Sequence, residues 1–173
     1  ICVVLAMTRI LGIDPGSRIT GFGIIDAEAN KVRYIDSGTI RTETKVFAQR
    51  LRCIFEKVAE IVETYRPDVL AIEDVFVQRN VDSALKLGQA RGAAICACAI
   101  QDLDVAEYAP RAIKLAVVGS GAASKEQVQF MVRSLLALHG PLQIDASDAL
   151  AVALCHNQHR SLNERIARTL QRG

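Results

Sequence analysis

Three strand-like segments follow one another near the start of the chain with only a few residues between them. Apolar and β-branched residues run from Ile10 to Asp14, from Gly21 to Asp26 and from Val32 to Gly38, with turn residues such as Pro15 and Gly16 between them. Connections this short join antiparallel neighbours, because a crossover between parallel strands needs a dozen or more residues. The three segments therefore predict an antiparallel meander.

The rest of the chain alternates helical and strand patterns. From Phe47 to Tyr65 apolar residues recur at intervals of three and four, which indicates an amphipathic helix that Arg66-Pro67 closes. The segments expected after it are strand 68–76, helix 83–102, strand 105–108, helix 124–138 and helix 145–159. This order predicts an α/β fold with a five-stranded mixed sheet, in which an antiparallel meander joins parallel strands and helices cover both faces.

The chain has 173 residues and half of them are apolar, which is enough for one domain with a substantial core. We expect this domain to span residues 8–159. Residues 1–7 are expected to be a non-native or disordered leader, because Met7 is a natural start. Residues 160–173 carry four arginines against Glu164 and are expected to form a loose basic tail.

Net charge and hydropathy restrict the partners less sharply. The formal net charge of +2 favours neither a nucleic acid nor any other class of partner by itself. Apart from the short leader, no uninterrupted apolar run approaches the roughly 18 residues that a membrane-spanning helix needs. We therefore expect a soluble cytoplasmic protein that does not contact a membrane.

Four carboxylates occupy unusual positions in this pattern. Asp14 and Glu73 each end an apolar strand, while Asp145 and Asp148 begin an apolar helix. Each acid also has an ordinary explanation. Asp14 before Pro-Gly can start a turn, Glu73 can end its strand in solvent, and the two later aspartates can cap their helix.

Taken together, the four acids indicate a metal site. Ligands of open α/β sheets gather beyond the carboxyl ends of the strands, where Asp14 and Glu73 lie if their strands are parallel neighbours. Asp145 and Asp148 are three residues apart and face one side of a first helical turn. Carboxylates this close raise each other's pKa and need a cation to stay ionised near neutral pH, and Mg²⁺ prefers such oxygen ligands.

The residues around these acids resemble the RuvC family of bacterial Holliday-junction resolvases. The similar blocks run in order from Thr8 to His159, and they are ILGIDPGSRITGFG around Asp14, AIEDVF around Glu73, DSALKLGQARG from Asp82 to Gly92, Lys114 with VVG, and DASDALA from Asp145. The family's four catalytic acids correspond to Asp14, Glu73, Asp145 and Asp148 without a substitution.

This resemblance implies an RNase H-like fold and a Mg²⁺-dependent endonuclease. The family acts as a homodimer on four-way junction DNA, nicks two strands of like polarity and leaves ligatable 5′-phosphate and 3′-hydroxyl ends. It also implies two Mg²⁺ ions per active site, replaceable by Mn²⁺, with Asp14 as the bridging ligand. The RuvA–RuvB branch-migration complex is the implied partner.

A predicted DNA-binding set surrounds the acids. Lys114 and Lys125 match lysines of the family near the catalytic centre, and Arg111 belongs to the same basic run, although a solvated helix face also explains such a run. Phe76 is either a core side chain or, as its family counterpart implies, a residue that stacks on an unpaired base. Arg79 and Lys86 complete the set.

Three further alternatives stay open at this point. The small residues between Leu85 and Ala94 fit a dimer surface and an internal helix contact equally well. The segment from Gly12 to Gly21 also resembles the phosphate loop of actin-like kinases, but that fold needs two such domains. A non-catalytic junction-binding protein is the third alternative, which the four acids disfavour because negative charge hinders DNA binding.

Overall fold

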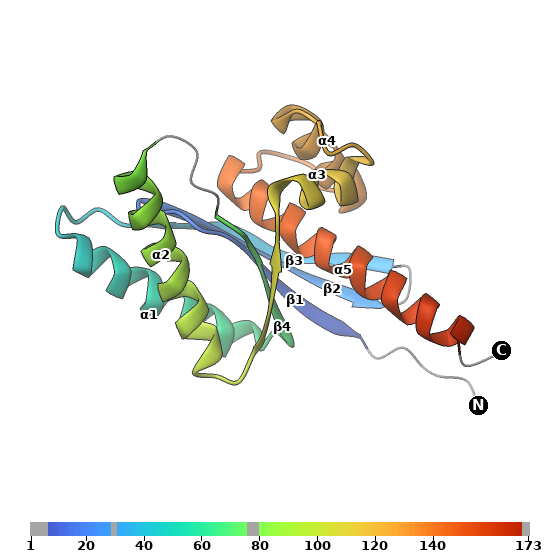
Figure 1. Ribbon diagram of the computed structural model, residues 1–173, viewed down its shortest axis with the longest axis horizontal. Coiled ribbons are helices and arrows are strands. Elements are labelled where there is room, and N and C mark those ends of the chain that lie inside the picture. Colours follow the sequence, from blue (N-terminus) through green and yellow to red (C-terminus); the bar gives the residue numbers. More distant parts are fainter. Residues whose placement is uncertain (1–6, 29–30, 76–79, 171–173) are drawn as a thin grey trace.

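The computed structural model describes residues 7–28, 31–75 and 80–170, and the predicted leader therefore lies almost entirely outside the described residues (Figure 1). The elements are five strands and five helices in this part of the chain. They are β1 (Thr8–Asp14), β2 (Ile19–Glu28), β3 (Lys31–Arg41), α1 (Phe47–Tyr65), β4 (Val69–Glu73), α2 (Val81–Ala99), β5 (Asp104–Tyr108), α3 (Pro110–Val118), α4 (Lys125–Leu135) and α5 (Ile144–Leu170).

The strands form one mixed sheet in the order β3-β2-β1-β4-β5. β1 pairs with β2 and β2 with β3 in antiparallel register, which confirms the predicted meander. β1 pairs with β4 and β4 with β5 in parallel register, because α1 and α2 return the chain across the sheet between them. The five-stranded mixed sheet expected from the sequence is therefore confirmed.

Helices cover both faces of this sheet, as Figure 1 shows. Alternate residues of each strand point to opposite faces, so each strand contributes to two cores. Leu11, Ile13 and Ile72 are fully buried on the face that α1 and α2 cover. Ile10 and Ala71 are fully buried on the other face, against residues of α3, α4 and α5.

Two predictions about the helices were wrong. α3 was not expected, although Pro110 at its first turn and Gly119 at its C-cap (φ +83°) are ordinary helix boundary signals. α5 does not stop at His159 but continues to Leu170, so most of the predicted loose tail is helical. No glycine or proline interrupts residues 160–170, and nothing local ends the helix there. In the described part of the chain, no helix is long and apolar enough to cross a membrane.

Candidate active site

Asp14 and Glu73 leave the sheet side by side. Ile13 pairs with Ile72 in the parallel register of β1 and β4, and the two acids are the next residues of those strands. Ile10 and Gly12, which share the face of Asp14 by alternation, pack against α5. Both carboxylates are therefore directed to the side of the sheet on which α5 lies.

Two glycines let the first turns of α5 approach this sheet closely. A Cβ atom on Gly12 would lie 2.1 Å from the carbonyl oxygen of Ala149, and one on Gly21 would lie 1.9 Å from the carbonyl oxygen of Asp145. Neither distance is sterically allowed, so only glycine permits this contact. The close approach brings Asp145 and Asp148 to the strand ends that carry Asp14 and Glu73.

A cleft of about 560 Å³ opens at these strand ends. Asp14, Glu73 and Asp148 line it, and Lys114 and Lys125 line the same cleft from α3 and α4. Asp145 is not among the lining residues, although its charge raises the pKa of both Asp14 and Asp148. The structure thus brings three of the four predicted acids into one cleft and places the fourth beside it.

The carboxylates repel one another strongly. The pKa of Asp14 is raised to about 7, first by burial and then by the charges of Asp148, Glu73 and Asp145. Burial is also the largest cause of the raised pKa of Glu73 and of Asp148. Among the described residues, no side-chain hydrogen bond to Asp14 or Glu73 stabilises their ionised forms.

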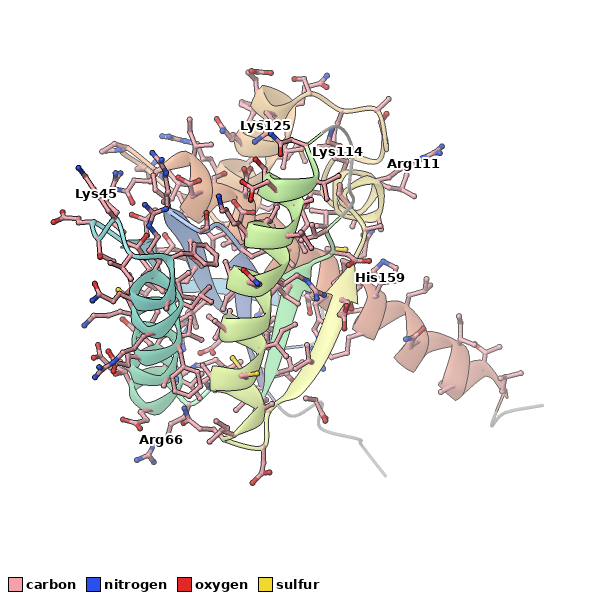
Figure 2. All side chains as sticks on the ribbon, turned by 60° about the vertical axis from the view of Figure 1, so that its left-hand side comes forward. Lys45, Arg66, Arg111, Lys114, Lys125 and His159 are labelled. Carbon is pink, nitrogen blue, oxygen red and sulfur yellow. The ribbon has the colours of Figure 1, made fainter. Side chains whose placement is uncertain are left out.

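Lys125 partly neutralises the acids. Its Nζ donates a hydrogen bond to Oδ2 of Asp148 at 3.3 Å, and its charge lowers the pKa of Asp14, Glu73 and Asp148. Lys114 likewise lowers the pKa of Glu73. The two lysines lie close together at one end of the molecule (Figure 2). Acidic and cationic side chains therefore line the same cleft.

The donor set fits a hard divalent cation. Asp14, Glu73, Asp145 and Asp148 offer carboxylate oxygens, and a cation would relieve the repulsion that raises the pKa of Asp14. Within residues 7–28, 31–75 and 80–170, however, no group of three or more His, Cys, Asp or Glu side chains is placed so that it could hold a metal ion. The four acids are an open cluster rather than a preformed cage.

Arg91 is a residue near this site that the sequence analysis did not single out. From α2 its Nε donates a hydrogen bond at 3.0 Å to the carbonyl oxygen of Glu73, and its guanidinium also pairs with Glu107. Its side chain is only 15% exposed. Arg91 therefore ties α2 to the ends of β4 and β5. No local pattern could have revealed it, because both contacts are made between separate elements.

Of the remaining predicted DNA-binding residues that the structure describes, one lines the cleft and one does not. Arg111 is exposed on α3 and lines the cleft, whereas Lys86 is exposed on α2 and forms an ion pair at 2.6 Å with Asp82, one helical turn away. Phe76 and Arg79 lie outside the described residues. Asp74, a neighbouring acid, accepts a hydrogen bond from the backbone of Val75 and lies 3.8 Å from Arg91.

Sequence comparison relates the chain to one group of nucleases. The family model described as crossover junction endodeoxyribonuclease RuvC matches residues 10–156. A relative from Methylococcus capsulatus, named crossover junction endodeoxyribonuclease RuvC, is 57% identical. The alignment spans 96% of this chain and the full length of the relative. A relative of the same name from Tolumonas auensis is 55% identical, with 93% of each chain covered.

Solved structures relate the fold to the same group. The RuvC of T. thermophilus, solved in complex with a Holliday junction substrate, is similar with a TM-score of 0.85 and 32% sequence identity. The similarity covers 90% of this chain and 96% of that one. A yeast mitochondrial Holliday junction resolvase has a TM-score of 0.66 at 12% identity, and this likeness concerns the fold alone.

Proposed function

The chain belongs to the RuvC family, and from this premise we propose that it resolves four-way DNA junctions as a crossover junction endodeoxyribonuclease. The relatives that carry this name are similar over nearly their whole length. Divalent-metal dependence follows from membership of this family of nucleases. The substrate of the T. thermophilus relative, a Holliday junction, is the substrate that we propose for this chain.

One observation supports this proposal most directly. Asp14, Glu73 and Asp148, which come from three separate elements, line one cleft together with Lys114 and Lys125. A protein that only bound DNA would gain nothing from half-buried acids facing phosphate, since they repel it. Acids at the centre and lysines at the rim instead suit the cleavage of a phosphodiester held across the cleft.

We infer that Asp14, Glu73, Asp145 and Asp148 hold two Mg²⁺ ions, with Mn²⁺ as a substitute. When bound, such ions supply positive charge to the reacting phosphate and lower the pKa of water. Asp14 has the central position, because β1 lies in the middle of the sheet between β2 and β4. Asp14 would therefore be the central ligand of the group.

The lysines carry out a different part of the reaction. Lys125 and Lys114 would bind the non-bridging phosphate oxygens and so orient the phosphodiester over the acids. Lys125 also lowers the pKa of Asp148 by pairing with it, which opposes the rise that burial causes. Cleavage is expected to leave a 5′-phosphate and a 3′-hydroxyl, which a ligase can reseal.

Resolution of a junction needs two symmetric nicks, and we propose that a homodimer makes them. The described part of α2 presents small and apolar residues to solvent, including Leu85, which is 62% exposed, and Gly88, which has open space around it. These residues support α2 as the dimer surface. Docking of RuvA and RuvB remains a proposal that rests on family membership alone.

A synthetic four-way junction with labelled strands tests the function. The protein is incubated with it in Mg²⁺, with Ca²⁺ as the binding-only comparison, and the nicks are mapped on all four strands and then offered to DNA ligase. We expect symmetric nicks in two strands of like polarity, both of which ligase seals. Binding without cleavage in Mg²⁺ would contradict the proposal.

A further inference from the structure

A second group of cations lies at the active-site end of the sheet, on the opposite side from α3 and α4. We call Arg18, Arg41, Lys45 and Arg50 the α1-side cations. Arg18 follows Asp14 by one short loop, Arg41 ends β3, and Lys45 and Arg50 flank the start of α1. None of them belongs to the basic run that the sequence analysis assigned to DNA binding.

Backbone contacts hold these residues together as one surface. Arg41 pairs with Ile19 in the register of β2 and β3, directly beside Arg18. The backbone N–H of Thr42 donates to the carbonyl oxygen of Arg18 at 2.9 Å, and the buried Thr42 hydroxyl donates to that of Ser17. The loop after Asp14 and the loop before α1 therefore form a single rigid rim.

The α1-side cations carry charge that their surroundings do not neutralise. Arg18, Arg41 and Lys45 are exposed, and none of the four forms an ion pair within the described residues. Arg50 is half-buried and donates a hydrogen bond at 2.7 Å to the neutral carbonyl of Thr44. Glu43 is the one acid in this stretch of sequence, and the first turn of α1 contains none.

The surface formed by the α1-side cations borders the catalytic cleft. Asp14 ends β1 and Pro15, the next residue, lines the cleft, so the loop that carries Arg18 borders it. In Figure 2, Lys45 lies toward the same end of the molecule as Lys114 and Lys125 but at the other side, whereas Arg66 lies at the opposite end. Cations thus flank the acidic cluster on both sides.

We propose that the α1-side cations bind the phosphate backbone of DNA on the far side of the cleaved phosphodiester from Lys114 and Lys125. This inference rests on the proposed function and extends it to a second phosphate-binding surface. A DNA strand bound by cations on both sides of the cleft runs across the acidic cluster in a fixed direction. Exposed cations that contact phosphates release counterions, so their contribution weakens as salt concentration rises.

The test compares two pairs of substitutions that remove equal charge. Arg18→Gln with Lys45→Gln alters the proposed surface. Lys31→Gln with Arg66→Gln alters two exposed cations, at the start of β3 and just after the end of α1, neither of which lines the cleft. Junction affinity is measured in Ca²⁺ over a series of salt concentrations, and circular dichroism with thermal unfolding checks that each protein is folded.

We expect the Arg18/Lys45 pair to reduce the slope of log affinity against log salt by about 1 to 2, and the control pair to leave it unchanged. In phosphate-ethylation interference, the Arg18/Lys45 variant should lose phosphate contacts only on one side of the nick site. If the wild type cuts junctions and the Arg18/Lys45 substitutions leave the salt slope unchanged, this inference alone is overturned. A wild type that binds junctions and does not cut them would overturn the proposed function instead.

Discussion

The Nζ of Lys125 lies 3.3 Å from Oδ2 of Asp148, so that a cation from the first turn of α4 contacts an acid from the start of α5. The contact joins the two chemical halves of the cleft, because Asp148 belongs to the acidic cluster and Lys125 to its cationic rim. The charge of Asp148 is the largest cause of the raised pKa of Lys125. Acid and base therefore stabilise each other's charged forms.

Replacement of Lys125 by Gln should weaken cleavage and change its pH dependence. Without this cation the pKa values of Asp14, Glu73 and Asp148 rise, so the acids become ionised only at higher pH. We expect cleavage about 100-fold slower near neutral pH, and an acidic limb of the pH–rate profile moved to higher pH. Lys57→Gln, which removes an exposed cation on α1, is the control. A slower reaction with an unmoved acidic limb would contradict this role.

Asp14→Asn should abolish cleavage and stabilise the protein in the presence of a chelator. The pKa of Asp14 is about 7 in the folded protein against 3.8 ordinarily, so the folded state holds this proton more tightly. The free energy of unfolding without metal therefore falls as pH rises from about 4 to 7 and then levels off. We expect the variant to be about 2 to 4 kcal/mol more stable at pH 8, with no difference below pH 4.

Urea unfolding at both pH values measures this difference, and junction binding in Ca²⁺ shows whether the DNA surface is intact. Binding should be retained or tighter, because a charge that faces phosphate has been removed. Equal stability of the two proteins at pH 8 would show that Asp14 is not under electrostatic stress.

Arg91→Gln should impair cleavage without a matching loss of junction binding. The variant loses the hydrogen bond to the Glu73 carbonyl and the ion pair with Glu107, so the end of β4 is held less firmly. We expect about 1 to 3 kcal/mol less stability and a higher Mg²⁺ concentration for half-maximal cleavage. Arg91→Lys should rescue little, since an ammonium group cannot reproduce the forked geometry.

Arg52→Gln removes an exposed arginine that pairs with Glu56 on α1 and serves as the matched control. It should leave both the stability and the Mg²⁺ requirement nearly unchanged. If both arginine variants moved the Mg²⁺ requirement equally, Arg91 would have no specific effect on Glu73.

Gly21→Ala should disturb the metal site from a distance. The new Cβ would lie 1.9 Å from the carbonyl oxygen of Asp145, so the start of α5 must move away from β2. We expect weaker Ca²⁺ binding by calorimetry and cleavage reduced at least about 100-fold. Gly88→Ala adds the same atom to the proposed dimer surface on α2, where nothing in the chain lies within 4 Å, and it is the control for Ca²⁺ binding alone, which it should leave unchanged. Normal Ca²⁺ affinity in the Gly21 variant would refute the packing argument.

Asp26→Asn should reduce stability at neutral pH but not in acid. Asp26 is buried in β2 and accepts hydrogen bonds from Arg9 at 2.7 Å and Arg33 at 2.9 Å, which hold its pKa below the usual range. Its contribution is therefore present above about pH 4 and is lost as pH falls through the lowered pKa. We expect a loss of about 1 to 3 kcal/mol at pH 7, measured by urea unfolding, and a difference that shrinks as the pH falls through the lowered pKa of Asp26.

Local sequence patterns determined much of this fold. Short connections between strands required the antiparallel meander, and strand ends at Asp14 and Glu73 could be read from apolar runs that stop. These features depend on neighbouring residues alone, since turn chemistry and side-chain alternation act over a few positions. α3 was missed although Pro110 and Gly119 mark its two ends, whereas the length of α5 was less predictable because helix length also depends on packing against the sheet.

Only the tertiary structure decided how the acids meet. The pairing of β1 with β4 sets Asp14 beside Glu73, and the close approach of α5 over Gly21 brings in Asp148 while Asp145 remains outside the cleft lining. The contact of Arg91 with Glu73 and the joining of Arg18 to the loop before α1 likewise come from separate elements. Such contacts depend on strand register and on packing between distant segments, which no local periodicity records.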